Sequence, residues 1–327
     1  MISPEHHEQS HEAHCRLIDM ISTAFGPVIG RLMDDESVIE IMVNPDGKVW
    51  IDRLGQGRIY TGHVINRHDA ERVILLIASS VGSECTHMNP LLSAELPGCG
   101  SRFQGVLPPV VENPSFTIRK KAVMVFTLDD YVSQGIMTES QKECIIKAVR
   151  EKKNILIAGG TSSGKTTFAN SLLHEIGLCK DRVVIIEDTL ELQCSAEDTV
   201  FLRTREGAAA MNDLIKATLR LRPDRIIVGE VRGKEALDLL KSWNTGHPGG
   251  VSTIHANGAR QALTRLEQLI QEAVVTVPRS LIAEAVDIVV FIEKYGQSRR
   301  IKTIAQVKGM KDDDYCVESI GKEAITL

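Results

Sequence analysis

Residues 155–167, Ile-Leu-Ile-Ala-Gly-Gly-Thr-Ser-Ser-Gly-Lys-Thr-Thr, contain the residue types that bind nucleotide phosphates. Gly159, Gly164, Lys165 and Thr166 satisfy the pattern G-x-x-x-x-G-K-[ST] directly after a short apolar run. The glycines let successive backbone N–H groups turn toward phosphates, which the lysine and a Mg²⁺ held by the threonine also contact. The predicted nucleotide ligands are Gly160, Thr161, Ser162, Ser163, Gly164, Lys165, Thr166 and Thr167. This stretch predicts a site for ATP or GTP.

Two further apolar segments end in carboxylates. Residues 226–229 run directly into Glu230, and residues 183–186 run into Glu187 and Asp188. Carboxyl ends of parallel strands meet at one edge of a sheet, so these groups would form a shared pocket for metal and water. Glu230 would polarise an attacking water, and Asp188 and Glu230 would help to hold Mg²⁺ with the loop threonine. An ordinary acidic residue at a strand end is the alternative interpretation.

Two histidines bracket a predicted strand at residues 251–254, with glycines before it. His247 precedes the strand and His255 follows it. Histidines near a triphosphate can contact the γ-phosphate or its attacking water. A lone histidine is more often a structural hydrogen-bonding group, and that alternative stays open for each of them.

Strands and helices alternate after residue 136, which favours a mainly parallel sheet with helices on both faces. The predicted strands cover residues 155–158, 183–187, 225–229, 251–254 and 287–292, with edge strands at about 300–308 and 314–320. The predicted helices cover residues 164–176, 208–221, 234–244 and 259–273. A capping box formed by Thr138 and Gln141 begins another helix, which runs to about Glu151. The fold class is therefore α/β.

The first third of the chain reads as a smaller α+β unit. Helical spacing and strand alternation predict helices at residues 15–25 and 67–81 and strands at residues 38–43, 48–52, 91–96, 102–107 and 115–120. The pattern loosens at residues 121–135, which we interpret as a linker that can act as a hinge. We therefore predict an N-terminal domain at residues 1–120 and a phosphate-loop domain at residues 136–327.

Composition disfavours several other classes. A net charge of −5 and 4% aromatic residues argue against binding of nucleic acid through a basic track or base stacking. No apolar run approaches the ~20 residues that a membrane helix needs, and no secretory pattern is present, so we expect a cytoplasmic protein. The seven cysteines include no C-x-x-C pair, which indicates reduced thiols. Four histidines lie near the start of the chain, at His6, His7, His11 and His14. They leave metal binding open, although a solvated terminus is the favoured interpretation.

These motifs occur in an order that resembles one family. Residues 159–167, Ile-Ile-Glu-Asp at 185–188, Ile-Val-Gly-Glu-Val-Arg-Gly at 227–233, and the histidine stretch at 246–257 resemble the traffic ATPases of type II and type IV secretion. The four-cysteine zinc insert of many type II members is missing. Residues 100–109 and 116–120 resemble the type IV branch, most of all the TrbB-like conjugal transfer ATPases, with pilus-retraction motors second.

The resemblance implies a RecA-like domain that hydrolyses ATP with Mg²⁺. By motif position Glu230 is implied as the general base or water-positioning group. Glu187 and Asp188 fall in the acidic box that helps to hold metal and water. His247 and His255 fall in the histidine box, with His255 the better candidate for contact with the γ-phosphate.

The resemblance also implies a homohexameric ring that acts at the cytoplasmic face of the inner membrane with membrane components of a secretion or conjugation channel. The N-terminal domain would cover the nucleotide and supply Arg102 and Arg119 to catalysis. No sequence-specific binding of nucleic acid is expected. Weaker candidates for action across a subunit boundary are Arg203, Arg205, Arg220 and Arg222.

Two other functions share the phosphate loop. A RecA- or helicase-type motor would depend on nucleic acid, against which charge and aromatic content argue. A nucleotide-gated assembly scaffold would bind ATP with negligible turnover, and the presence of Glu230 weighs against it.

Overall fold

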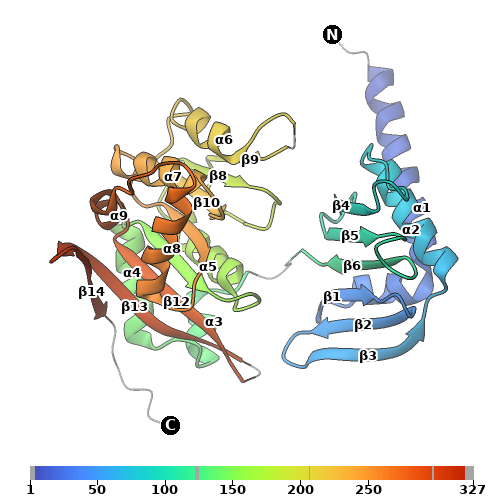
Figure 1. The fold of residues 1–327 in the computed structure, drawn as a ribbon, viewed down its shortest axis with the longest axis horizontal. Helices are drawn as coiled ribbons and strands as arrows, with labels where there is room; N and C mark the ends of the chain where they lie inside the picture. The colour runs from blue at the N-terminus through green and yellow to red at the C-terminus, as the bar shows by residue number, and fades with distance from the viewer. Residues whose placement is uncertain (1–3, 122–124, 206, 297, 321–327) are drawn as a thin grey trace. The chain divides into compact units, whose positions relative to one another are not determined.

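The chain forms two compact units, Met1–Val123 and Met124–Leu327, in a computed structural model (Figure 1). The described residues are 4–121, 125–205, 207–296 and 298–320, with side chains from residue 16 onward. No helix in these described stretches is long and apolar enough to cross a membrane.

The first unit is an antiparallel sheet with two helices. Its elements are α1 (Pro4–Asp34), β1 (Val38–Val43), β2 (Lys48–Arg53), β3 (Gly57–Val64), α2 (Arg67–Ser80), β4 (Leu91–Glu95), β5 (Arg102–Val106) and β6 (Ser115–Arg119). The strand order among the described residues is β3-β2-β1-β6-β5-β4. Helix α1 is interrupted at Gly26, where φ is 68° and Pro27 follows, so the predicted helix end at this point is confirmed. The side chains of the four early histidines lie outside the described residues.

One face of this sheet is apolar. Ile41, Phe103 and Ile118 alternate with polar neighbours and are fully buried, together with Ile74 and Ile77 of α2. Period-two alternation along a strand places every second side chain on the same face, so the remaining side chains of these strands lie on the opposite, polar face.

The second unit contains an eight-stranded sheet among its described residues. Its elements are α3 (Leu128–Ser133), α4 (Glu139–Arg150), β7 (Ile155–Gly159), α5 (Lys165–Gly177), β8 (Val183–Glu187), β9 (Thr199–Arg203), α6 (Met211–Thr218), β10 (Arg225–Glu230), α7 (Glu235–Asn244), β11 (Val251–His255), α8 (Ala259–Gln271), α9 (Arg279–Ala285), β12 (Ile288–Tyr295), β13 (Ser298–Lys311) and β14 (Asp314–Ile320). The order is β14-β13-β12-β7-β11-β10-β8-β9. Strands β12 to β9 in that order pair in parallel, whereas β13 and β14 are antiparallel.

Helices cover both faces of this sheet (Figure 1). One apolar core lies between the sheet and helices α6 to α9, and the other lies between the sheet and helices α3 to α5. Every residue of β7 and β8 is buried, because a parallel strand between two helical layers has no solvent-facing side. The parallel direction brings the carboxyl ends of β7, β8, β10 and β11 to one edge.

The predicted linker at residues 121–135 extends too far. Thr127 caps helix α3 in a capping box with Asp130, and Leu128 and Tyr131 are buried in the core of the second unit. Residues 122–124 lie outside the described part of the chain. The segment after Thr127 therefore belongs to the second unit, because its two buried side chains anchor a short helix that has too few residues for a clear pattern.

Candidate active site

The phosphate-loop sequence forms a turn that only its glycines allow. Gly164 has a φ of 97°, in the left-handed region that side chains disfavour, and helix α5 begins directly after it. A Cβ atom at Gly159 would lie 2.4 Å from Ser163 Oγ and 2.5 Å from Ile292 O. Both positions therefore require glycine, and together they set the path from β7 into α5.

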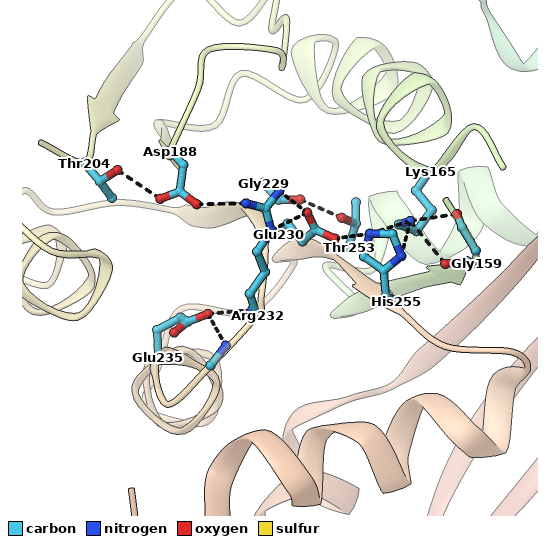
Figure 2. Close-up of polar contacts among 12 residues, drawn as sticks. Gly159, Lys165, Asp188, Thr204, Gly229, Glu230, Arg232, Glu235, Thr253 and His255 are labelled. Carbon is cyan, nitrogen blue, oxygen red and sulfur yellow. Dashed lines mark hydrogen bonds and ion pairs between the residues drawn. The ribbon is translucent and has the colours of Figure 1, made fainter. Parts of the chain in front are cut away.

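Lys165 lies across the mouth of this loop. Its Nζ donates hydrogen bonds to Gly159 O at 3.1 Å and Gly160 O at 3.0 Å, and its side chain is buried (Figure 2). The same Nζ lies 3.4 Å from each ring nitrogen of His255. The ammonium group is thus held at the loop by neutral acceptors, which phosphate oxygens could replace.

The remaining predicted loop ligands fit an anionic group. Gly160, Thr161 and Ser162 are exposed, Ser163 is buried, and the two threonines that follow Lys165 are half-buried in the first turn of α5. No side chain caps the start of this helix, so its first N–H groups face the loop without a side-chain acceptor. Among the described residues no three histidine, cysteine, aspartate or glutamate side chains cluster as they would around a metal ion.

His255 and Glu230 lie on the two strands next to the loop. His255 is the register partner of Gly159 across β11 and β7, and its Nε2 lies 2.8 Å from Glu230 Oε1. Pairing of β10 with β11 shifts between Val228 and Glu230, as at a β-bulge, which re-aims the carboxylate. Burial lowers the pKa of His255, and the ammonium of Lys165 lowers it further against the opposite effect of Glu230. The imidazole is therefore neutral at pH 7.

Arg232 links Glu230 to Asp188, which follows β8. This role of Arg232 was not predicted from the sequence. Its Nε donates to Glu230 Oε2 at 2.7 Å, and its Nη1 lies 3.5 Å from Asp188 Oδ2 (Figure 2). The backbone N–H groups of Arg232 and Gly233 both donate to Glu235 Oε1, which fixes this turn. Its position two residues after Glu230 was the signal available in the sequence.

The acidic pair after β8 divides into two environments. Asp188 is exposed and accepts a hydrogen bond from Thr204 Oγ1 at 2.9 Å. Glu187 is buried, and its Oε1 accepts from the backbone N–H groups of Glu191 and Leu192, each at 3.0 Å. Glu187 thus supports the turn that carries Asp188, and its catalytic role stays a prediction.

The structure separates the two histidines that the sequence analysis grouped. His247 precedes β11, whereas His255 ends it, so they lie at opposite ends of a strand that runs parallel to β7. Five strand residues span roughly 15 Å at about 3.3 Å per residue. The prediction that His247 shares the site at the phosphate loop is therefore wrong within this chain, because the loop follows the carboxyl end of β7.

Arg102 and Arg119 belong to the first unit and lie opposite each other. They are direct partners of β5 and β6 in the antiparallel register, on the polar face of that sheet. Glu95 is the next partner beyond Arg102, and Glu40 is the next beyond Arg119. Two cations face to face favour a bound anion or flanking carboxylates.

A strand, a phosphate loop and a helix on a parallel sheet, with carboxylates at neighbouring strand ends, define a P-loop protein. The profile of the family described as "Type II/IV secretion system protein" matches residues 91–319. The chain belongs to this family.

Similar proteins agree with that assignment. The chain is 49% identical over 309 residues to the probable conjugal transfer protein TrbB of Sinorhizobium fredii, covering 94% of each chain. It is 33% identical over 328 aligned positions to the type IV secretion system protein PtlH of Bordetella pertussis, covering 88% of this chain and 94% of that one. The structure of the ATPase DotB of Legionella pneumophila shares the fold at a TM-score of 0.59 and 17% identity, over 90% of this chain and 81% of that chain.

Proposed function

We propose that this chain is an ATPase that energises conjugative transfer or a related type IV secretion process. The observation that carries the proposal is the unbroken set of contacts from Lys165 through His255 to Glu230 beside the phosphate loop. Membership of the secretion family and 49% identity to a conjugal transfer protein support the transfer role over pilus retraction.

The phosphate loop would bind ATP through its own backbone. N–H groups at the start of α5 would donate to phosphate oxygens, and Lys165 would exchange the carbonyls of Gly159 and Gly160 for the β- and γ-phosphates. Thr166, Asp188 and Glu230 would hold Mg²⁺ directly or through water. A Mg²⁺ held there would supply positive charge to offset that of the phosphates.

Glu230 would accept the proton of the attacking water. Arg232 orients this carboxylate through a hydrogen bond to Oε2, whereas Oε1 lies 2.8 Å from His255 Nε2 and is buried without a hydrogen-bond partner among the described residues, so it is available to accept the proton of the water. A neutral His255 between Lys165 and Glu230 is suited to contact the γ-phosphate, because it can donate or accept one hydrogen bond without adding charge.

The second unit would then be a RecA-like motor domain, and the first unit would cover the nucleotide in a homohexameric ring. Arg102 and Arg119 are suited to that role because they present two adjacent cations on the polar face of their sheet. We further propose that the ring acts at the cytoplasmic face of the inner membrane, with membrane components of the transfer channel as partners.

Hydrolysis of Mg-ATP by the purified full-length chain tests this proposal. Lys165→Ala is expected to abolish hydrolysis, whereas Lys153→Ala, which removes a lysine paired with Asp287 at the other edge of the sheet, retains it. Equal hydrolysis by wild type and Lys165→Ala would contradict the assignment.

Three further measurements separate the related functions. Native mass spectrometry should find a hexamer, and a monomer with full activity would exclude the ring. Strong, salt-sensitive stimulation by single-stranded DNA would favour a nucleic-acid motor. Tight binding of ATP with the same negligible turnover in wild type and Glu230→Gln would favour a scaffold.

A further inference from the structure

The phosphate loop has two flanks, and only one of them carries the groups described so far. Strand β7 lies between β11, which supplies His255, and β12 on its other side. Strand β12 runs parallel to β7 and continues to Tyr295, so the β12–β13 hairpin turns at the same edge of the sheet as the loop. Arg299 lies at the start of β13 in this hairpin.

Arg299 is packed directly on the phosphate loop. A Cβ atom at Gly164 would lie 2.7 Å from Arg299 Cδ and 3.0 Å from Arg299 Nε, so the arginine stem occupies the space that the glycine leaves open. Ile292 of β12 contacts the same point, at 3.5 Å from that Cβ position. The guanidinium group is therefore held next to the first residue before helix α5.

Among the described residues no carboxylate forms an ion pair with Arg299. Its Nε is shielded from solvent and has no hydrogen-bond partner among the described residues. Its cross-strand partner is Lys294, and the carboxylate of Glu293 is already shared by Arg300 and Lys302 at 2.9 Å each. A half-buried cation without a counter-charge is costly, so this arrangement favours an anionic ligand.

The phenol of Tyr131, which interacts electrostatically with Arg299, does not supply that counter-charge. Burial raises the pKa of Tyr131 to about 12, so the phenol is neutral near pH 7.

The other flank, with Lys165 and His255, has the groups suited to the γ-phosphate. An extended triphosphate bound there would direct its nucleoside end toward the opposite flank, where Arg299 lies.

We propose that Arg299 binds the α-phosphate of the nucleotide and so helps to select nucleotides over free phosphate. The proposal rests on the proposed function, since it needs the loop to hold a nucleotide. An arginine suits the role because its guanidinium can donate two hydrogen bonds to one phosphate group.

Calorimetric titration of the full-length protein with Mg-ADP tests the proposal. Arg299→Gln, which keeps part of the stem on Gly164 but removes the charge, should weaken binding about 10-fold or more, and Arg299→Lys should restore much of it. In steady-state hydrolysis, Arg299→Gln should raise KM for ATP and change kcat little. The matched control is Arg300→Gln on the same hairpin, whose arginine already pairs with Glu293 and should not change ADP affinity.

The outcomes distinguish the two proposals. Equal ADP affinity in wild type and Arg299→Gln would overturn the role of Arg299 alone, provided that wild type binds ADP and Lys165→Ala does not. An equal loss in Arg299→Gln and Arg300→Gln would also overturn it, because the effect would then belong to the hairpin fold. Failure of wild type to bind any adenine nucleotide would overturn the proposed function, and the role of Arg299 with it.

Discussion

The two edges of the parallel sheet use the same residue types in different ways. At the amino edge Arg225 is buried, and its guanidinium donates to Asp181 at 2.7 Å, Val149 O at 2.9 Å and Gly249 O at 3.3 Å. At the carboxyl edge the guanidinium of Arg232 donates to the carboxylate of Glu230. Among the described residues it forms no hydrogen bond to a backbone carbonyl. Arg225 holds backbone segments together, whereas Arg232 holds the side chain of Glu230, which we propose to be the general base.

The rest of each edge follows the same division. At the amino edge Asn154 accepts from Gly250 N and donates to Ala285 O, while Asp287 accepts from Asn154 N. At the carboxyl edge the chain of contacts runs between side chains, and its members are partly exposed. Contacts at the carboxyl edge, including those of Lys165 with two carbonyls, can be exchanged for contacts with a ligand, whereas a bond to a buried backbone group at the amino edge would be lost with no ligand to replace it. Charged residues therefore indicate function only at the edge that faces the loop.

The largest expected effect is that of Glu230→Gln. The amide keeps the size of the side chain but cannot accept a proton, so kcat should fall about 10²- to 10⁴-fold. Nucleotide affinity and melting temperature should change little. Asp287→Asn, a matched change at the amino edge, should lower the melting temperature and leave kcat of the folded protein unchanged. A loss of activity in both variants with equal loss of stability would remove the distinction between the edges.

Arg225→Met should lower the stability of the fold, which Glu230→Gln leaves nearly unchanged. Burial alone would raise the pKa of Asp181, but hydrogen bonds from Lys152 and Arg225 hold it below its usual value. Removing the buried arginine leaves Asp181 with Lys152 and takes a donor from Gly249 O, while Val149 O still accepts from the N–H of Lys152 at 3.2 Å; the loss should cost about 3–5 kcal/mol. Urea denaturation measures this loss. A variant that unfolds at the wild-type midpoint would show that the amino edge is not structural.

The sequence predicted most of the buried strands, whereas of the edge strands β4 and β14 were predicted and β3 and β9 were missed. Strands β1 and β8 have their predicted ends because apolar residues fill all but one position of each strand, Glu40 in β1 and Glu187 in β8. Strand β3 was missed because it is an edge strand with exposed polar residues and two glycines. Strand β9 lies at one edge of the larger sheet. It was also missed, because its side chains are exposed or half-buried. Local patterns report burial, so elements with little burial give little signal.

The part of the site that depends on strand direction was predicted from the sequence. Lys165, Glu230 and His255 meet because each follows the carboxyl end of a parallel strand. The same rule places His247 at the amino edge of the sheet, because it precedes β11. It was grouped with His255 because both fall in one sequence motif. Arg299 had no local signal, since its contact with Gly164 depends on a hairpin more than a hundred residues later in the chain.

Arg232→Ala should have a smaller effect than either of the first two changes. Loss of the contact with Glu230 leaves the carboxylate free to rotate, so kcat should fall about 10-fold, a change of roughly 1.4 kcal/mol in the barrier, while KM stays near the wild-type value. Arg232→Lys should recover part of kcat, because an ammonium keeps the charge but loses the planar fork. Arg260→Ala, which removes an exposed arginine paired with Asp314, is the control. A rise in KM with unchanged kcat would mean that Arg232 binds nucleotide instead of positioning Glu230.

The smallest expected effect is a pH response of His255. Its pKa is lowered from 6.5 by burial first and by the Lys165 ammonium second, so the unfolded chain binds this proton more readily than the folded one. Stability contributed by this group is therefore unaffected above about pH 6.5 and falls as the pH drops below it. Removing the Lys165 charge with Lys165→Met should raise the pKa of His255 toward 6.5, as followed by NMR titration of its ring. An unchanged pKa of His255 in Lys165→Met would show that the ammonium and the imidazole do not interact, so His255 would not link the phosphate loop to Glu230.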